Sequence, residues 1–327
     1  MTAEYFGACI VTMCLLLPAT VRAEPAVTFA HEQGKIIVKI AEAPVAVYCY
    51  ADPEILRPFF ASVRAPGGVQ VTRNHPPIEG KDLTDHPQNH PGIFLAFGDL
   101  GGGDFWRNRS RVVHESFAVQ PKGGLNKGSF AVRNRYDRQD GTTVSHELGR
   151  YQFLVRPSGY LLLWDSTFSA DKEFSFGDQE EMGLGVRVAS PITVKAGGAM
   201  LDSKGRVGPQ QIWGQTANWC DSSGMIDGRR VGVTLMAAPT NFRPSWLHAR
   251  DYGLLVANPF GRKAFTGGEP SRVVVRPGET FQLRYGVLLH ADPIGSSPDL
   301  KAAYNDFLDL LAKPSLSSQR TIETRLP

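Results

Sequence analysis

The chain has 327 residues, of which 42% are hydrophobic and 20% charged, with 35 Lys and Arg against 32 Asp and Glu. A formal net charge of +3, without a block of like charges, argues against nucleic acid or an anionic membrane surface as a partner. Residues 24–313 are long enough for one large domain with an ample core. No Pro/Gly/Ser-rich linker divides them, so we expect a single domain.

The first 23 residues are typical of a secretory signal peptide. Their apolar core runs from Ala8 to Leu17, and small residues follow at Ala19 and Ala23, which predicts cleavage after Ala23. This core is shorter than the roughly 20 residues that a membrane-spanning helix needs. We therefore expect a periplasmic or secreted protein that is not inserted in a membrane once the signal is removed.

Of the four cysteines, Cys9 and Cys14 lie in the predicted signal peptide, which leaves Cys49 and Cys220. These two can form a disulfide in an oxidising compartment. They can equally remain as buried thiols that pack as small hydrophobic groups. Neither has neighbouring ligands at metal-binding spacing, and we predict no resident metal or cofactor.

Strand-like segments fill the chain from its start. KIIVKI and VAVYCY come first, IFLAF follows at Ile93–Phe97, and VVHESFAV, SFAVRNRY, TTVSHELGRYQFLV and YLLLWDSTFSA succeed one another. Asp140-Gly141 predicts a type I′ hairpin turn, because both residue types tolerate positive φ. Further strand candidates are LGVRVAS, QIWGQTANW, RVGVTLMAA, YGLLVANPF, RVVVRPGE and FQLRYGVLLH.

One helix is predicted near the C-terminus, with Ser297 as its cap, Pro298 at its first position and apolar residues at helical spacing from Leu300 to Leu311. Residues 314–327 resemble a disordered tail. Roughly a dozen strands without intervening helices predict an all-β protein, a large antiparallel β-sandwich or barrel with one C-terminal helix.

The stretch Asp85–Trp106 concentrates the most unusual chemistry. His86 and His90 precede its apolar strand, and Gly101–Gly103 follow it. Each histidine stands before a proline, which disfavours the α region, so the two are not a helical metal pair. In an extended segment they lie up to roughly 13 Å apart. One of them is a candidate general acid or base; the alternative is a pair of loop histidines that bond backbone groups.

Four segments in order resemble the DUF6807 family, also labelled PmoA-like: DHPQNHPGIFLAFGDLGGGDFW, EEMGLGVRV, QIWGQTANWCDSSG and WLHARDYGLLVANPFG. The resemblance implies an exported β-sandwich, similar in its strand-rich style to the galactose mutarotase-like supersandwich, that acts in carbohydrate metabolism. The family label "methane oxygenase PmoA" suggests a metal-dependent oxygenase instead. A membrane monooxygenase subunit would need several spanning helices, which this sequence lacks.

Glu181 and Arg187 are six residues apart on a predicted strand and therefore share a face, whereas Glu180 points the other way. They are a surface ion pair, or a general-base carboxylate beside a guanidinium that binds a sugar hydroxyl or carboxylate. In SWLHARDYG, alternation places His248 and Arg250 on one face. That segment is either a charged edge strand or part of the same site.

Trp106 and Trp246 stand among ionisable residues and are candidates for a sugar-stacking platform, with core packing as the alternative. Arg57 and Arg73 flank the Asp85–Trp106 stretch and are candidate contacts to hydroxyl or anionic groups. A metal site built from Asp85, His86 and His90 is a weaker alternative.

The sequence thus predicts an exported enzyme that acts on a sugar or glycoside by acid-base chemistry. Hydrolysis, elimination and epimerisation each need one acid and one base, so they are not separable at this stage. The alternatives are a non-catalytic carbohydrate-binding sandwich and a metal-dependent oxygenase. The predicted catalytic residues are His86, His90, Glu181 and His248, and the predicted substrate contacts are Arg57, Arg73, Asp85, Trp106, Arg187, Trp246, Arg250 and Asp251.

Overall fold

The computed structural model describes Met1, residues 24–292 and residues 296–313. The predicted signal peptide, apart from Met1, and the predicted tail at 314–327 lie outside these residues. Among the helices of the described residues, none combines the length and the apolar character needed to cross a bilayer.

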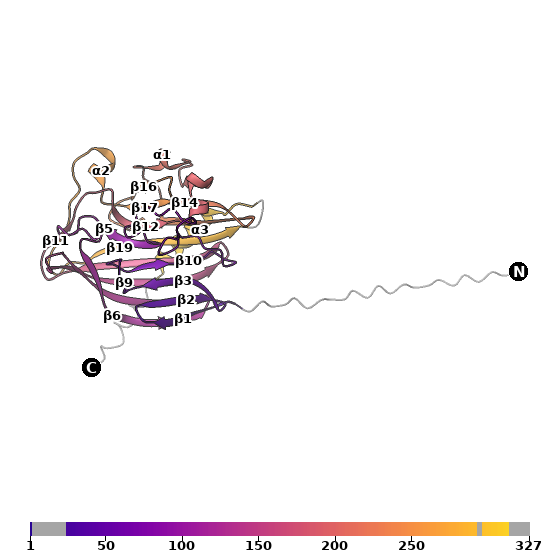
Figure 1. The fold of residues 1–327 in the computed structure, drawn as a ribbon, viewed down its shortest axis with the longest axis horizontal. Helices are drawn as coiled ribbons and strands as arrows, with labels where there is room; N and C mark the ends of the chain where they lie inside the picture. The colour runs from indigo at the N-terminus through magenta and orange to yellow at the C-terminus, as the bar shows by residue number, and fades with distance from the viewer. Residues whose placement is uncertain (2–23, 293–295, 314–327) are drawn as a thin grey trace.

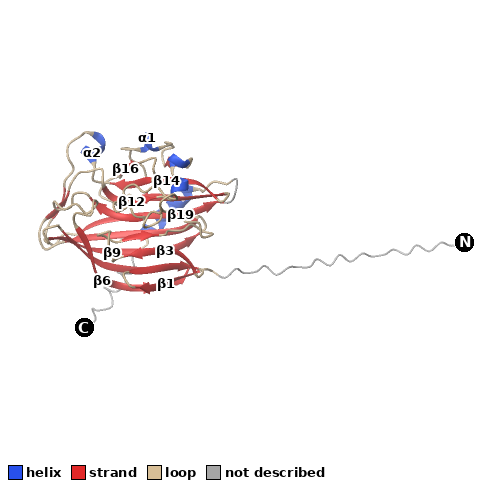
Figure 2. Cartoon of the chain, viewed as in Figure 1, coloured by secondary structure: helices blue, strands red, loops and turns tan. Residues whose placement is uncertain are grey.

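Two large antiparallel sheets form a sandwich, which confirms the predicted fold class (Figures 1 and 2). The nine-stranded sheet has the order β16 (Trp246–Ala249), β17 (Leu254–Asn258), β12 (Met182–Arg187), β5 (Ile93–Phe97), β4 (Phe59–Ala61), β3 (Ala43–Cys49), β2 (Lys35–Ile40), β1 (Ala26–Glu32) and β7 (Gly124–Leu125). The eight-stranded sheet has the order β13 (Ala199–Asp202), β14 (Trp219–Ile226), β15 (Arg229–Ala237), β19 (Phe281–Asp292), β10 (Gly159–Ser169), β9 (Thr143–Arg156), β8 (Lys127–Asp137) and β6 (Arg111–Lys122).

The remaining elements are short, apart from one longer helix. They are the ribbon β11 (Phe174–Phe176) with β18 (Val273–Val275), the short helices α1 (Pro209–Ile212) and α2 (Arg262–Thr266), the 3₁₀ turns Ser190–Ile192 and Val194–Ala196, and the helix α3 (Leu300–Ala312). In Figure 1, α1 and α2 lie close to β16, at the end of the nine-stranded sheet opposite β1.

The main core lies between the two sheets and is rich in aromatic rings. The ring centre of Tyr48, in the nine-stranded sheet, lies 5.1 Å from that of Tyr151 on β9. The ring centre of Phe60 lies 5.7 Å from that of Trp164 on β10. On β9 the buried residues alternate along the strand, as expected when one face is covered. Burial of these large side chains supplies most of the apolar area that stabilises the sandwich.

The central strands of the nine-stranded sheet are covered on both faces. Every residue of β5, β12 and β17 is buried, which accounts for their continuous apolar runs. One face packs on the other sheet, and the opposite, outer face packs on loops through Ile55, Phe94 and Trp106. The loops on either side of β5, which belong to the Asp85–Trp106 stretch, therefore lie on the outer face of this sheet.

The helix α3 covers the outer face of the eight-stranded sheet, where Leu300 and Phe307 pack on Leu161 and Leu288. Its predicted start was wrong, because the N-cap is Asp299, whose carboxylate accepts a hydrogen bond from the Ala302 N–H at 2.9 Å. A carboxylate satisfies the free N–H groups of a first turn as well as a serine hydroxyl does.

Several local predictions also differ from the structure. The segment QIWGQTANW is not a strand: it contains the end of α1 and a turn, and the strand β14 begins only at Trp219. The hairpin between β8 and β9 is confirmed, but only Gly141 of the Asp140-Gly141 pair has positive φ (81°), so the type I′ assignment was wrong. Of the two alternatives for Cys49 and Cys220, the structure has free thiols.

Candidate functional site

A row of paired residues crosses the outer face of the nine-stranded sheet. His248 pairs with Val256, Val256 with Gly185, Gly185 with Phe94 and Phe94 with Phe59. A side chain at Gly185 would meet the Phe94 ring, since a Cβ there would lie 2.6 Å from it. The missing side chain therefore lets the Phe94 ring lie flat over β12.

Arg187 lies on the same face, two residues beyond Gly185, at the end of β12. Its guanidinium donates two parallel hydrogen bonds to Asp85, at 2.9 Å from Nη1 to Oδ2 and at 2.6 Å from Nη2 to Oδ1. The Tyr252 ring covers the guanidinium at 4.6 Å. The side chain of Arg187 is 1% exposed and that of Asp85 is 35% exposed, so this bidentate pair is anchored in the protein and open to water on the carboxylate side.

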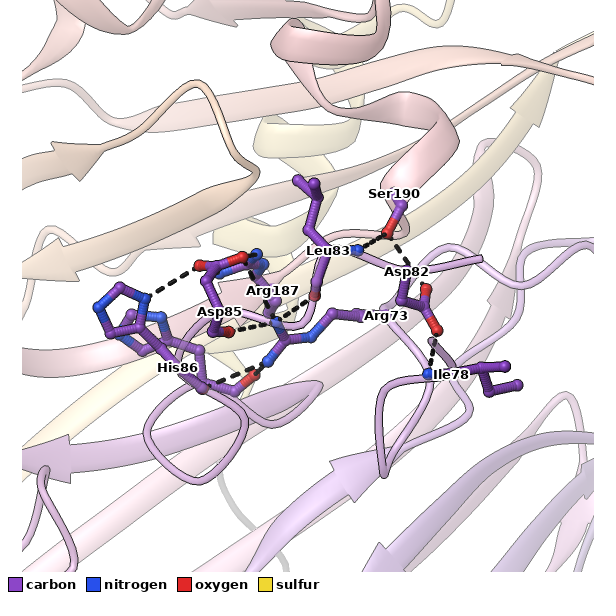
Figure 3. A network of polar contacts seen from close by, with 9 residues as sticks. Arg73, Ile78, Asp82, Leu83, Asp85, His86, Arg187 and Ser190 are labelled. Atoms are coloured by element: carbon purple, nitrogen blue, oxygen red, sulfur yellow. Dashed lines mark hydrogen bonds and ion pairs between the residues drawn. The ribbon is translucent and has the colours of Figure 1, made fainter. Parts of the chain in front are cut away.

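Asp85 also contacts the next residue, because Nδ1 of His86 lies 2.9 Å from Oδ2 (Figure 3). Burial raises the pKa of Asp85, but the hydrogen bonds from Arg187 and His86 outweigh it and hold that pKa well below its ordinary value. A carboxylate can only accept, so Nδ1 of His86 carries the proton and Nε2 keeps a lone pair when the ring is neutral. The His86 side chain is 51% exposed, so this lone pair is available to a ligand.

The loop that carries His86 is held by two buried arginines. Arg73 donates to the carbonyl oxygens of Leu83 (2.8 Å), Asp85 (2.6 Å) and His90 (3.0 Å). The same loop is fixed at its entry, where Asp82 accepts hydrogen bonds from Ser190 and the Ile78 N–H (Figure 3). Burial lowers the pKa of Arg73 to about 10, which leaves it charged at neutral pH.

Arg57 grips the other side of the loop through main-chain oxygens. It donates to the carbonyls of Asn89 (2.6 Å) and Trp106 (3.0 Å) and to the Asn108 amide oxygen (3.0 Å), with the Phe94 ring at 5.1 Å. Arg57 and Arg73 are 3% and 2% exposed. Their predicted contact with substrate was therefore wrong, since their donors are used on the protein's own backbone.

His90 lies beneath His86. The loop curls so that the His90 N–H bonds to the His86 carbonyl at 3.1 Å, and the two rings lie 5.0 Å apart instead of at an extended separation. His90 is 4% exposed, stacks with Phe94 and Tyr252, and its Nδ1 is buried without a partner. Burial and the nearby cations Arg187, Arg57 and Arg73 lower its pKa to about 2, so it is a neutral floor of the site.

Glu180, His248 and Arg250 form the second half of the site. Arg250 Nη2 donates to Glu180 Oε2 at 2.9 Å, and His248 Nε2 lies 3.6 Å from the same oxygen. His248 Nδ1 lies 3.3 Å from the Glu180 carbonyl, so Nδ1 donates and Nε2 bears the lone pair. Burial raises the pKa of Glu180 despite Arg250, and burial lowers the pKa of His248 to about 4.

Aromatic side chains connect the two halves. Tyr252 stacks with His86 at 5.9 Å, covers Arg187 and interacts with Arg250. Next to the His248 ring, the Phe265 ring of α2 lies 5.4 Å from that of Trp213 and 6.4 Å from that of Trp246. The segments 85–90, 180–187 and 246–252 therefore meet on one sheet face.

Three predicted site residues lie elsewhere or point away. Glu181 does not pair with Arg187, because its carboxylate binds Arg107 at 2.7 Å. Residues 180–181 precede β12 in a bend, so strand alternation does not extend to them. Trp106 is 1% exposed and packs on Phe94, which excludes a sugar-stacking platform there. Asp251 is exposed in the turn after β16.

The predicted weak alternative of a metal site finds no support in the donor set. Both oxygens of Asp85 are bound by Arg187. Within residues 24–292 and 296–313, no group of three or more His, Cys, Asp or Glu side chains is arranged to hold a metal ion. These residues do not fit a copper or iron centre of the kind that an oxygenase would need.

Sequence reasoning missed Glu180, Tyr252 and Trp213. Glu180 and Glu181 were distinguished only by strand alternation, and that rule fails in a bend. Tyr252 lies in the SWLHARDYG segment, where a tyrosine among ionisable residues is equally consistent with packing. Trp213 stands in QIWGQTANW, among the four segments that carry the family resemblance, and that was its one available signal.

The fold and the site define an antiparallel β-sandwich with a half-exposed ionisable cluster on the outer face of one sheet. The chain belongs to DUF6807, a family of unknown function, whose model matches residues 35–304. A comparison with curated protein sequences finds no match.

Solved structures with similar folds include a galactose mutarotase-like protein from Clostridium acetobutylicum, with a TM-score of 0.39, 9% identity and coverage of 82% of this chain and 99% of that one. A galactose mutarotase-like protein from Lactobacillus casei has a TM-score of 0.35 and 11% identity, with coverage of 81% of this chain and 100% of that one. A heparan sulfate lyase from Pedobacter heparinus has a TM-score of 0.34 and 10% identity. The match covers 88% of this chain but only 38% of the lyase. At these scores the likeness carries no argument about activity.

Proposed function

We propose that this chain is an exported carbohydrate-active enzyme that uses acid-base chemistry, with His86 as the base and Glu180 as the acid. The observation that supports this most is the meeting of segments 85–90, 180–187 and 246–252 on one sheet face. Two proton-transfer groups with opposite tasks lie there, joined through Tyr252 and Arg250.

His86 is suited to accept a proton. Its Nδ1–H is fixed by Asp85, and Arg187 holds that carboxylate ionised and in place. The free Nε2 lone pair is on a half-exposed ring. An imidazole that a carboxylate holds in one orientation, with its second ring nitrogen free, can act as a general base.

Glu180 is suited to donate a proton. Burial raises its pKa, and its side chain is 29% exposed, so it is sheltered yet within reach of a ligand. His248, which burial keeps neutral, lies beside its Oε2. The half-buried rings of Trp246 and Tyr252 offer apolar surfaces to the face of a pyranose. Hydrolysis, elimination and epimerisation all use this pairing of one base with one acid.

The test is a screen of purified protein against a glycan and glycoside library. New reducing ends, unsaturated products and epimer exchange are measured by colorimetry, ultraviolet absorbance and NMR. We expect one substrate class to turn over, with His86→Ala and Glu180→Gln each nearly inactive. Full activity in both variants would contradict the proposal. Binding without turnover, lost in Trp246→Ala but kept in His86→Ala, would instead indicate a non-catalytic carbohydrate-binding protein.

A further inference from the structure

A cleft lies beside the proposed site and has no part in the chemistry described so far. Its cavity volume is about 740 Å³, and its walls include Gly101, Gly102, Glu173 and Arg272. The glycines belong to the loop that follows β5, the same cluster that makes the sequence of this stretch unusual. We call this cavity the glycine cleft.

The glycine cleft and the site share two borders. Asp178 lines the cleft, and Glu180, two residues later, belongs to the site. Two residues of extended chain span at most about 7 Å. In α2, Lys263 lines the cleft while Phe265 packs against Trp246 in the site. A ligand that is longer than one sugar ring can therefore reach from Glu180 into the cleft.

The lining of the cleft mixes donors and acceptors. Asp178 accepts hydrogen bonds from three backbone N–H groups, those of Lys263 (2.9 Å), Ala264 (3.1 Å) and Ser271 (2.6 Å). Asp99 accepts from a backbone N–H of the glycine loop at 3.1 Å. Lys263 and Arg272 add cationic donors. Both signs of charge are present without an excess of cations, which suits uncharged hydroxyl groups better than a polyanion.

The two glycines also leave the cleft wall without side chains. Gly101 and Gly102 have φ of 57° and 80°, which glycine adopts without steric cost. A Cβ at Gly102 would have only one protein atom within 4 Å, Arg138 Nη1 at 3.9 Å. The main chain is therefore open to close approach by a ligand at Gly102, whereas a Cβ at Gly101 would lie 2.5 Å from the Val144 side chain.

We infer that the glycine cleft binds neutral sugar units that continue from the unit reacting at Glu180. The preferred substrate is then an oligosaccharide or polysaccharide, not a monosaccharide or short glycoside. This inference rests on the proposed function and adds the substrate length and charge.

The test measures KM against chain length for the glycan found by the screen, offered as pure neutral oligomers of two to six units. We expect KM to fall by about tenfold between two and four or more units, because one hydrogen bond from a charged donor in the cleft contributes roughly that factor. The double variant Lys263→Ala with Arg272→Ala should raise KM about tenfold for the long oligomers and leave the disaccharide unchanged. Lys301→Ala on α3 is the matched surface control.

A KM that is equal for all lengths, or that rises by the same factor for all lengths in the double variant, would overturn the cleft assignment while leaving the proposed function intact. A preference for sulfated or uronate oligomers over neutral ones would overturn the neutral-ligand assignment. If the wild type turned over no glycan, and calorimetry with His86→Ala detected no binding of the hexamers, the proposed function and this inference would fall together.

Discussion

The outer faces of the two sheets both bury ionisable groups, but they satisfy them differently. On the nine-stranded sheet, the Arg187 side chain is 1% exposed and that of its partner Asp85 is 35% exposed. Asp85 also accepts a hydrogen bond from the half-exposed His86. On the eight-stranded sheet, His290 is fully buried and lies 2.9 Å from Asp221 and 3.0 Å from Asp292. Both nitrogens of His290 are occupied, whereas His86 keeps one nitrogen free.

The comparison separates a structural cluster from a candidate reactive one. In the His290 cluster, Asp221 also accepts from the Thr234 hydroxyl at 2.8 Å. Burial alone lowers the pKa of His290, but the two aspartates outweigh it and raise that pKa. A closed set of this kind stabilises the fold and offers nothing to a ligand. The cluster around Asp85 and Glu180 is incomplete on its exposed side, which is where a substrate would complete it.

The largest effect is expected when a reactive group is removed. His86→Ala and Glu180→Gln should each lower kcat by roughly 10²–10⁴-fold, the usual contribution of general acid-base catalysis. His146→Ala is the matched control for His86, since the two side chains are 49% and 51% exposed. Glu181→Gln is the control for Glu180, at 32% against 29%. An equal loss of kcat in the two control variants would contradict the specific roles of His86 and Glu180.

The next effect is on stability, in the closed cluster. His290→Ala should lower the free energy of unfolding by about 3 kcal/mol, because it leaves two carboxylates without their buried cation. Its kcat should stay close to that of the wild type. Since the folded-state pKa of His290 is raised, its contribution is complete below about pH 6.5 and is lost as the pH rises through the folded pKa. Urea denaturation at pH 6 and pH 9 measures this, and a difference between wild type and variant that grows toward pH 9 would contradict it.

A smaller loss of stability is expected from Arg187→Met. Removal of one partner of a fully buried pair costs roughly 3–5 kcal/mol, but here Asp85 can be rehydrated, so we expect about 2 kcal/mol. The variant should also lose most of its turnover, because the carboxylate that orients His86 is released. Thermal or urea denaturation with kinetics on the same preparation tests both points. A variant that is destabilised yet fully active would show that Arg187 serves the fold alone.

The smallest effect concerns the two desolvated histidines. The pKa of His90 is lowered to about 2 and that of His248 to about 4. Below an ordinary pKa of about 6.5 the unfolded chain binds protons that the folded chain rejects, so stability falls as the pH falls. Between pH 6.5 and 5.5 each histidine should contribute a loss of about 1 kcal/mol. His90→Phe should reduce that slope, whereas an unchanged slope would mean that His90 does not remain neutral in the fold.

The sequence predicted the fold better than the site. Strand periodicity is a local property, so the segments from Arg111 to Ser169 were placed correctly, as was the strand Ile93–Phe97. The sequence also marked the three segments that meet on the outer face of the nine-stranded sheet. What failed was the choice of partners, because Arg57 and Trp106 are buried in the protein and Glu181 pairs with Arg107 instead of Arg187.

Those failures have a common physical cause. A residue type does not reveal whether its hydrogen bonds are used inside the protein, and that depends on loops whose course no periodicity describes. Arg73 has the donors of a substrate-binding arginine, yet it uses them on carbonyl oxygens of the loop. Buried carbonyl oxygens without a hydrogen-bond partner would destabilise the fold. Glu180 and Glu181 differ by one residue in a bend, where alternation does not apply.

The grip of Arg57 and Arg73 on the loop has a consequence for protein engineering. Both arginines hold main-chain oxygens, which every residue possesses, so the path of the loop does not depend on the side chains of Gln88 and Asn89. The exposed side chain of Gln88 can be exchanged without loss of the hydrogen bonds that shape the loop. Substitutions at Gln88 can therefore vary the surface next to His86 while the main chain of the loop stays in place.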